Sequence, residues 1–316
     1  MKKTGAVAVI GAGLAGLSCA QALRAGGANV RIFERAEFVG GRCATRLWQG
    51  HLVDYGVQYF TAQTGEFKKE LLTRLRQFRP IISPVLDADN NIVPSEFGPR
   101  FYVLQGNNYL AHVLSRGLEM RLNTDVDKVT FQNGKIECMG ETFAALVSTL
   151  PGPQSARLLG LKQDPIKYEP CLTALIEYGS GDMARECYAR VMPEETGSVA
   201  ASYCENHKAG RIVGQKTVFV VNASPRFSRK HLDEPSENYL PTLIKENAKL
   251  WRITDQTCTA SSIHRWTYAH PRPDSILPVT LPPGAFLCGD SLVPATVEAV
   301  WTDGQRAAHE VLAYLA

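Results

Sequence analysis

A glycine-rich turn near the start of the chain has the residue types and spacing needed to hold a dinucleotide. The turn reads Gly11-Ala12-Gly13-Leu14-Ala15-Gly16 and follows the β-branched run Val7-Ala8-Val9-Ile10. We expect Gly11 to permit a tight turn, Gly13 to let the backbone approach a pyrophosphate, and Gly16 to let a helix pack closely on a sheet. The N–H groups at the start of that helix would bind the phosphates.

An acidic residue follows at the distance that ribose recognition requires. Glu34 ends a second apolar run, Val30-Arg31-Ile32-Phe33, and lies eighteen residues beyond Gly16. A carboxylate at this position can accept hydrogen bonds from both ribose hydroxyls, and it disfavours the phosphorylated ribose of NADP. The turn, helix and acid therefore predict a dinucleotide site, without deciding between NAD and the ADP half of FAD.

The segment after Glu34 favours FAD. Residues 35–45 read RAEFVGGRCAT, in which a Gly-Gly pair permits close backbone approach and Arg42 can neutralise a second phosphate. With this segment, the sequence resembles the flavin-dependent amine oxidase superfamily, in which GxGxxG, the acid and a GGR segment together bind FAD. The resemblance implies that Arg35, Gly41 and Arg42 contact a non-covalently bound FAD.

Further segments resemble the renalases within that superfamily. Val53-Asp54-Tyr55-Gly56-Val57-Gln58-Tyr59-Phe60-Thr61 is similar to the DxGAQYFT stretch of renalases, and residues 264–269 match HRWxYA, the most specific signal. Similar segments lie at 147–154, 206–211, 223–232 and 287–308. The resemblance implies further cofactor contacts from Gln58, Tyr59, Phe60, Val126, Asp290 and Val297.

Three positions depart from the renalase pattern. Asn222 stands where the family commonly has His, Phe227 where it has Trp, and Thr296 where an Arg would lie near the flavin pyrimidine. Flavin binding should persist, because the glycine turns and the helix end carry most of it. The identity of the substrate stays open.

The expected chemistry needs positioning residues more than acids and bases. Flavin carries the redox chemistry, and hydride transfer to its N5 atom needs no obligatory side-chain acid or base. His264, Trp266 and Tyr268 alternate, so on a strand they would share one face and line a substrate pocket. Alternatively, Trp266 and Tyr268 are core residues of a domain interface. Asp290 would bond the flavin ribitol, or else cap a loop.

These motifs predict an α/β fold. We expect a Rossmann-type, glutathione-reductase-like FAD-binding domain and a smaller α+β substrate domain with a mixed or antiparallel sheet. The resemblance implies a discontinuous FAD-binding domain (1–64, 105–155 and 260–316) and a substrate domain (65–104 and 156–259). Asn133-Gly134 predicts a hairpin, 218–221 a buried strand, 240–251 a helix and 271–283 a loop.

Composition excludes several other classes. The 316 residues include 34 Lys and Arg against 31 Asp and Glu, with no block of like charge, which disfavours nucleic-acid and membrane-surface binding. No apolar run is long enough to span a membrane. The eight cysteines include no CxxC pair and have no nearby His cluster, which predicts buried thiols and no metal site. We therefore interpret Cys288 as a buried structural thiol and not as a covalent flavin anchor. A glycine fingerprint directly follows MKKTGAVAVI, so we expect a cytoplasmic protein.

The resemblance implies a function. Renalases oxidise 2- or 6-dihydro isomers of NAD(P)H and pass the electrons to O2, giving hydrogen peroxide. The expected partners are therefore a small-molecule substrate and O2, and the oligomeric state stays open. Two alternatives remain: a flavin amine oxidase or desaturase acting on another small amine or biosynthetic intermediate, and a flavin-binding protein without turnover.

Overall fold

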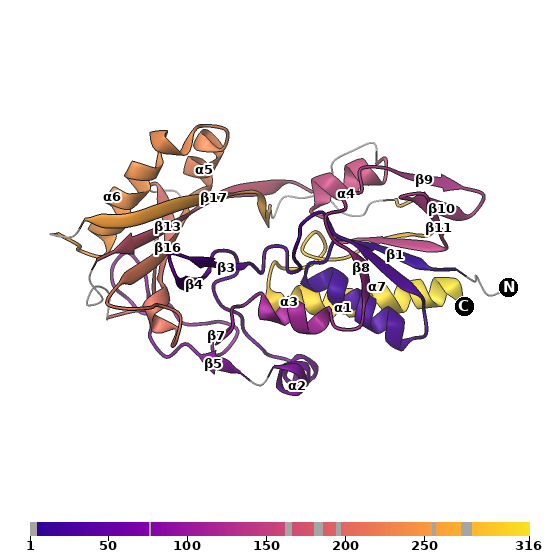
Figure 1. Cartoon of the computed structure of the whole chain (residues 1–316), viewed down its shortest axis with the longest axis horizontal. Helices are drawn as coiled ribbons and strands as arrows, with labels where there is room; N and C mark the ends of the chain where they lie inside the picture. The colour runs from indigo at the N-terminus through magenta and orange to yellow at the C-terminus, as the bar shows by residue number, and fades with distance from the viewer. Residues whose placement is uncertain are drawn as a thin grey trace.

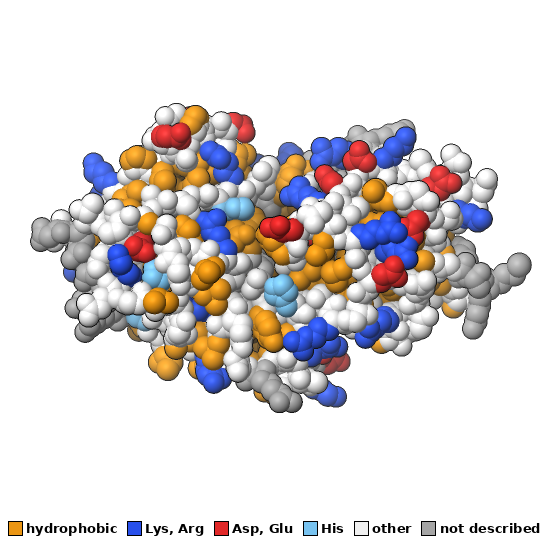
Figure 2. Space-filling view, in the orientation of Figure 1, with side chains coloured by type: hydrophobic (Ala, Val, Ile, Leu, Met, Phe, Trp, Pro, Cys, Tyr) orange, Lys and Arg blue, Asp and Glu red, His pale blue; other side chains and the backbone are white. Residues whose placement is uncertain are grey.

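The protein is described by a computed structural model that covers residues 5–75, 77–161, 166–179, 186–193, 197–254, 257–272 and 280–316. Two main sheets, each with its own helices, form two lobes that lie side by side (Figure 1). Both chain ends lie at the outer end of the lobe that holds the parallel sheet (Figure 1). Basic and acidic side chains are interspersed over the face drawn in Figure 2.

A parallel sheet forms the centre of the first lobe. Among the described residues its order is β18 (Ala285–Leu287), β12 (Ala145–Ser148), β1 (Val7–Ile10), β2 (Val30–Phe33) and β8 (Glu119–Arg121). Every residue of β1 and β12 is buried, as expected for strands covered on both faces. The structure confirms the two strands that the sequence predicts on either side of the glycine turn.

Helices cover one face of this sheet. They are α1 (Leu14–Ala25), α3 (Tyr109–Leu114) and α7 (Val297–Leu315). Helices α1 and α7 approach closely at Gly304, where a Cβ atom would lie 2.4 Å from the carbonyl oxygen of Ala15. Helix α2 (Gly65–Arg74) packs into the same core through Phe67 and Leu71. This packing differs from the expected domain boundary after residue 64, which assigns α2 to the other domain.

A three-stranded antiparallel sheet covers the opposite face. It consists of β9 (Val129–Gln132), β10 (Lys135–Cys138) and β11 (Glu141–Phe143), and it packs through Ile136 and Phe143 against Ala8 and Leu146. The predicted hairpin at Asn133-Gly134 is confirmed, since both residues have positive φ and the turn joins β9 to β10. The alternating run over 142–150 is divided between β11 and β12, which belong to different sheets.

The second lobe contains a mixed sheet, as predicted. Its order among the described residues is β17 (Cys258–Pro271), β13 (Tyr168–Tyr178), β16 (Thr217–Ala223), β15 (Val199–Cys204), β14 (Ala189–Val191) and β6 (Val85–Leu86). Its neighbouring strands are antiparallel except β14 and β6. Helices α5 (Pro225–His231) and α6 (Leu240–Leu250) cover one face, and α6 confirms the helix predicted there.

The N-terminal segment reaches across to the other face of this mixed sheet. The hairpin of β3 (Thr45–Trp48) and β4 (His51–Asp54) lies there, with Val53 and Tyr55 packed against Leu175 and Val220. The small sheet of β5 (Phe78–Pro80) and β7 (Phe101–Val103) and helix α4 (Gly152–Leu158) complete the connections. Residues 273–279 of the predicted loop 271–283 lie outside the described residues. In the described part, no helix combines the length and apolar character that membrane crossing requires.

Candidate flavin and substrate site

The glycine turn is held by packing at two positions and open at the third. Gly11 has φ +104°, and a Cβ there would lie 2.5 Å from Oγ1 of Thr149. A Cβ on Gly16 would lie 2.2 Å from the carbonyl oxygen of Gly11. A Cβ on Gly13 would meet nothing within 4 Å. Other protein atoms therefore leave no room for a side chain at Gly11 or Gly16, whereas the space beside Gly13 is open to another group.

Helix α1 begins beside this open side. Gly13 is its N-cap and supplies no side-chain acceptor, and the first turn, which contains Leu14 and Ala15, carries no acidic residue. The first N–H groups of an α-helix have no partner within the helix, and they lie at its positive end. This end of α1 is therefore suited to a pyrophosphate.

Glu34 is fixed directly beside the turn. One of its carboxylate oxygens accepts a hydrogen bond from the backbone N–H of Ala12 at 2.8 Å, and the other accepts from Ala36 at 2.9 Å. Each oxygen keeps a second lone pair, so both can still accept from ribose hydroxyls. Arg35 is exposed, whereas Val126 is buried in the apolar cluster that also contains Phe33.

Arg42 and Asp290 meet each other in a bidentate ion pair. The Nη2 atom of Arg42 lies 2.6 Å from Oδ1 of Asp290, and Nη1 bonds Oδ2. Nη1 also donates to the carbonyl oxygen of Ala269 at 3.0 Å. Burial opposes the charge on Arg42, yet the hydrogen bonds and attraction from Asp290 raise its pKa overall. The sequence predicts a separate cofactor contact for each of these residues. In the structure they bind each other, next to Gly41, whose Cβ position lies 3.6 Å from the Cα of Gly13.

Tyr168 belongs to this group, although sequence reasoning does not identify it. Its hydroxyl donates to Oδ1 of Asp290 at 3.1 Å and lies 3.1 Å from Oγ of Ser291. Burial raises the pKa of Tyr168 to about 12, with a further contribution from the Asp290 charge. The residue stands 122 positions from Asp290 and in no matched segment, so no local signal could have indicated it.

The aromatic residues of β17 form two separate contacts. The rings of His264 and Trp266 lie 4.2 Å apart, and Tyr55 contacts both, at 4.9 Å and 5.6 Å between centroids. The register of β17 on β13 shifts between Trp266 and His270. Beyond this irregularity, Tyr268 contacts Tyr168 at 5.9 Å. The expected shared face therefore brings His264 and Trp266 together, while Tyr268 lies with the Arg42–Asp290 group.

We call the adjoining rings of Tyr55, His264 and Trp266 the aromatic wall. Arg46 lies at the end of this wall that is opposite to Tyr268. Its guanidinium carbon stands 5.0 Å from the Tyr55 ring centroid, and Nη2 donates to Oγ of Ser262. Burial, together with the Arg46 charge, lowers the pKa of His264 below its usual value. The imidazole is therefore neutral at pH 7. Tyr55 falls within the renalase-like stretch, whereas nothing in the sequence singles out Arg46.

Of the three predicted cofactor contacts Gln58, Tyr59 and Phe60, Gln58 has a polar atom that is left without a partner. The Nε2 atom of Gln58 donates to the Asp54 carbonyl oxygen, while its buried Oε1 has no hydrogen-bond partner among the described residues. That oxygen can accept a bond from a bound group. Tyr59 lies under the guanidinium of Arg100, and Phe60 is 2% exposed within the apolar core.

Two side chains at the beginning of α7 accept hydrogen bonds from backbone N–H groups. Thr296, one of the three departures, caps the helix by accepting a hydrogen bond from the Ala299 N–H at 3.2 Å. Val297 is buried, and Glu298 accepts from the backbone N–H groups of Gln63 and Thr64, each at 2.7 Å. Thr296 therefore serves the helix, and it replaces the family's arginine with a cap.

A buried ionic cluster explains two of the renalase-like segments. Asp54, Glu205, Lys208 and Arg211 have side chains that are 0% exposed or nearly so. The Lys208 ammonium lies 2.9 Å from Oδ2 of Asp54 and 2.6 Å from Oε1 of Glu205, and Arg211 lies 2.8 Å from Asp54. Two basic and two acidic side chains therefore contact one another, and burial raises the pKa of Glu205 while Lys208 opposes that shift. The cluster ties β4 to the chain after β15, next to Tyr55.

Cys288 is buried, as the sequence predicts. Cys288 is 1% exposed, and a hydrogen bond with Cys19 together with burial raises its pKa well above the usual value. A thiol in that state is a poor nucleophile, which supports a buried structural role. In the described residues, no group of three or more His, Cys, Asp or Glu could hold a metal ion.

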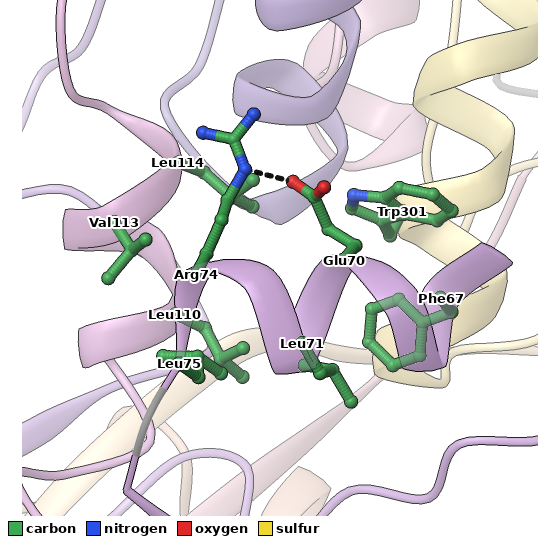
Figure 3. Close-up of a pocket in the computed structure, with 9 residues that line it drawn as sticks. All are labelled: Phe67, Glu70, Leu71, Arg74, Leu75, Leu110, Val113, Leu114 and Trp301. Carbon is green, nitrogen blue, oxygen red and sulfur yellow. Dashed lines mark ion pairs between the residues drawn. The ribbon is translucent and has the colours of Figure 1, made fainter.

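Two surface cavities lie away from this site. One lies between α2, α3 and α7, where Phe67, Leu71 and Trp301 point into it and the Glu70–Arg74 ion pair stands at its edge (Figure 3). The other, of about 330 Å³, lies on the β9–β11 sheet and is lined by Lys128, Glu137 and neighbouring residues. Neither touches the glycine turn or the aromatic wall.

Two comparisons with known proteins match only part of this chain. Residues 9–75 match the family model of an NAD(P)-binding Rossmann-like domain. A Drosophila melanogaster protein named as a possible lysine-specific histone demethylase 1 is 31% identical over 124 residues. That match covers 36% of this chain and 14% of the relative, so the chain spans a small part of the relative's length.

Solved structures share the fold over nearly the whole chain. A reduced UDP-galactopyranose mutase has a TM-score of 0.80 at 11% identity, with 98% of this chain and 96% of that chain covered. Cyclohexylamine oxidase from Brevibacterium oxydans IH-35A has a TM-score of 0.75 at 13% identity, with 98% and 99% covered. Putrescine oxidase bound to putrescine has a TM-score of 0.72 at 13% identity, with 98% and 99% covered.

These likenesses define the fold class. The predicted α/β architecture with a Rossmann-type dinucleotide-binding domain is confirmed. At 11–13% identity these neighbours, two of them named as oxidases, show the fold alone, so the flavin cofactor, the oxidoreductase activity and the flavin amine oxidase superfamily stay predictions. The renalase-like subtype stays a prediction.

Proposed function

We propose that the protein is an FAD-dependent oxidoreductase that oxidises a small molecule. The observation that carries this proposal is the open side of the glycine turn at Gly13, beside the unpaired N–H groups of α1 and the fixed carboxylate of Glu34. FAD held there would supply a two-electron acceptor for the substrate, and its reoxidation by O2 would give hydrogen peroxide.

The residues around the turn fit such a cofactor. The N–H groups of α1 would hold the pyrophosphate, and Glu34 would accept from the ribose hydroxyls. Gly41 has φ +55°, and its Cβ position lies 3.6 Å from the Cα of Gly13, so the second glycine segment borders the same space. The buried unpartnered Oε1 of Gln58 supplies an acceptor. Cys288 offers no accessible thiolate, which favours non-covalent binding.

The aromatic wall would orient the substrate. His264 and Trp266 are half-buried; Tyr55 stacks on Trp266 and meets His264 edge-on, so a flat ring could lie against the remaining surface of these rings. Such positioning accelerates a reaction by holding the donor carbon in reach of the acceptor. We propose dihydronicotinamide isomers of NAD(P)H as substrates, on the strength of the renalase-like segments. The neutral His264 would offer a hydrogen bond without adding charge.

A small amine is the second candidate. It is supported by the fold neighbours that are named putrescine oxidase and cyclohexylamine oxidase. Arg46 weighs against it, because a guanidinium beside Tyr55 and His264 repels an ammonium group. The division into discontinuous FAD-binding and substrate domains and a cytoplasmic location remain part of the proposal.

Two measurements test the proposed function. The purified protein should be yellow and release intact FAD on acid denaturation, and flavin that stays attached to the denatured chain would refute non-covalent binding. Under anaerobic conditions, dihydronicotinamide isomers should bleach the flavin, and air should restore its colour with release of hydrogen peroxide. Bleaching by amines alone would favour the second candidate, and no bleaching by either class would favour a flavin-binding protein without turnover.

A further inference from the structure

Arg46 is a cation without a carboxylate partner at the candidate substrate wall. Its pKa is lowered by burial, and only Tyr55 opposes that effect. Among the described residues no Asp or Glu forms an ion pair with it, and its buried Nε atom has no hydrogen-bond partner. The guanidinium therefore keeps donor groups that the fold itself does not use.

Neighbouring arginines are placed differently. Arg42 has Asp290 as a bidentate partner, and Arg211 has Asp54. Partly burying a charge is unfavourable unless it gains a partner, so an arginine left without one at a binding surface indicates a ligand that supplies it. The planar fork of arginine matches carboxylate and phosphate groups, which accept two parallel hydrogen bonds.

The position of Arg46 fixes where that group would lie. Ser262, its hydrogen-bond acceptor, precedes His264 and Trp266 on the same side of β17, and the Arg42–Asp290 pair lies beyond Trp266. Two residues of a strand span about 6.6 Å, so Ser262 stands roughly 13 Å from Trp266 along β17. Arg46 therefore marks the end of the wall that is remote from the cofactor-binding residues.

We propose that the substrate carries an anionic group, a carboxylate or a phosphate, that Arg46 binds while its ring lies on His264 and Trp266. This inference rests on the proposed function for the site's location, and it specifies the charge of the substrate. The guanidinium of Arg46 lies over the Tyr55 ring in a cation–π contact, which stabilises it beside the wall. Ser262 accepts from Nη2, Nε is buried, and Nη1 is left for the anion.

Binding of simple aromatic probes to the oxidised holoenzyme tests the proposal. Benzoate, phenyl phosphate, benzamide and benzylamine share a ring and differ in charge, and calorimetry or Trp fluorescence measures each Kd. At least one anion should bind about tenfold or more tightly than benzylamine, and the better anion identifies carboxylate or phosphate. Equal or tighter binding of benzylamine would overturn the proposal, whichever substrate the enzyme turns over.

Variants locate the effect at Arg46. Arg46→Gln should raise the Kd of the preferred anion about tenfold to a hundredfold and change the Kd of benzamide less than about twofold. Arg79→Gln is the matched control, because Arg79 is exposed on β5 away from the wall, and it should change neither Kd. An unchanged anion Kd in a folded Arg46→Gln protein with normal FAD content refutes the proposal. If that variant fails to fold, the charge series on the wild-type protein still decides it.

These outcomes separate the inference from the proposed function. A protein that prefers anionic probes but oxidises no dihydronicotinamide retains the inference and loses the proposed substrate. A protein that oxidises dihydronicotinamides with the same kcat and KM in wild type and Arg46→Gln retains the function and loses the inference.

Discussion

Replacing Lys208 by Met should destabilise the protein strongly and in a pH-dependent way. Lys208 is fully buried and lies 2.9 Å from Asp54 and 2.6 Å from Glu205. With an effective dielectric constant of about 20, each contact is worth roughly 6 kcal/mol of gross attraction, which the desolvation of the ammonium largely offsets. Removing one partner of a buried pair leaves an uncompensated charge and typically costs about 3–5 kcal/mol.

The pH dependence distinguishes charge from packing. Burial raises the pKa of Glu205, while the Lys208 charge holds it down, so the variant's Glu205 should have a still higher pKa. Between its unfolded and folded pKa values this carboxyl binds more protons in the folded state, so the free energy of unfolding falls as pH rises through that window. The loss in Lys208→Met should therefore be larger near pH 8 than near pH 5.5, where a proton can neutralise Glu205.

Thermal unfolding measures this effect. With an unfolding entropy of about 2.1 cal/mol/K per residue, a loss of about 3–5 kcal/mol corresponds to a Tm decrease of roughly 5–8 °C for a chain of 316 residues. Lys230→Met provides the control, since Lys230 is exposed on α5, and its Tm should remain that of the wild type. An unchanged Tm in Lys208→Met would refute the ionic cluster. An equal decrease at both pH values would instead assign the loss to packing.

Three further substitutions test the candidate site. Gly13→Val should fold but lose FAD, because its side chain enters the open space beside α1 where the cofactor would approach, and a normal visible spectrum would contradict the placement of the pyrophosphate. Glu34→Gln should weaken FAD retention by about 1.5–3 kcal/mol for each charge-assisted hydrogen bond lost, as measured by the Kd for FAD, and unchanged affinity would remove Glu34 from ribose binding. Trp266→Ala should keep its FAD and slow anaerobic flavin reduction on the order of a hundredfold, because a displacement of about 1 Å is enough to spoil reactive geometry. Reoxidation by O2 should change much less, and equal loss of both half-reactions with poor FAD retention would mark Trp266 as a core residue instead.

Local patterns determined the dinucleotide-binding half of this protein. The run Val7–Ile10, the glycine turn and α1 follow directly from residue order, because strand and helix periods and glycine turns depend on neighbours in sequence. The hydrogen bond from Ala12 to Glu34 spans only 22 residues, within one β-helix-β unit of fixed geometry. The Asn133-Gly134 hairpin is equally local. Sequence alone could therefore predict the fold class and the local geometry of the glycine turn and Glu34.

Only the tertiary structure decided how Arg46, Tyr55 and the aromatic residues of β17 come together. Arg42 meets Asp290 across 248 residues, and Arg46 meets Ser262 across 216. The β3–β4 hairpin leaves the first lobe and packs on the second, which brings Tyr55 and Arg46 to β17. A sequence pattern fixes which face of its own strand a residue occupies, but not which distant strand that face meets. The charge beside His264 and Trp266 depends on that meeting, so it could be described only once both sheets were in place.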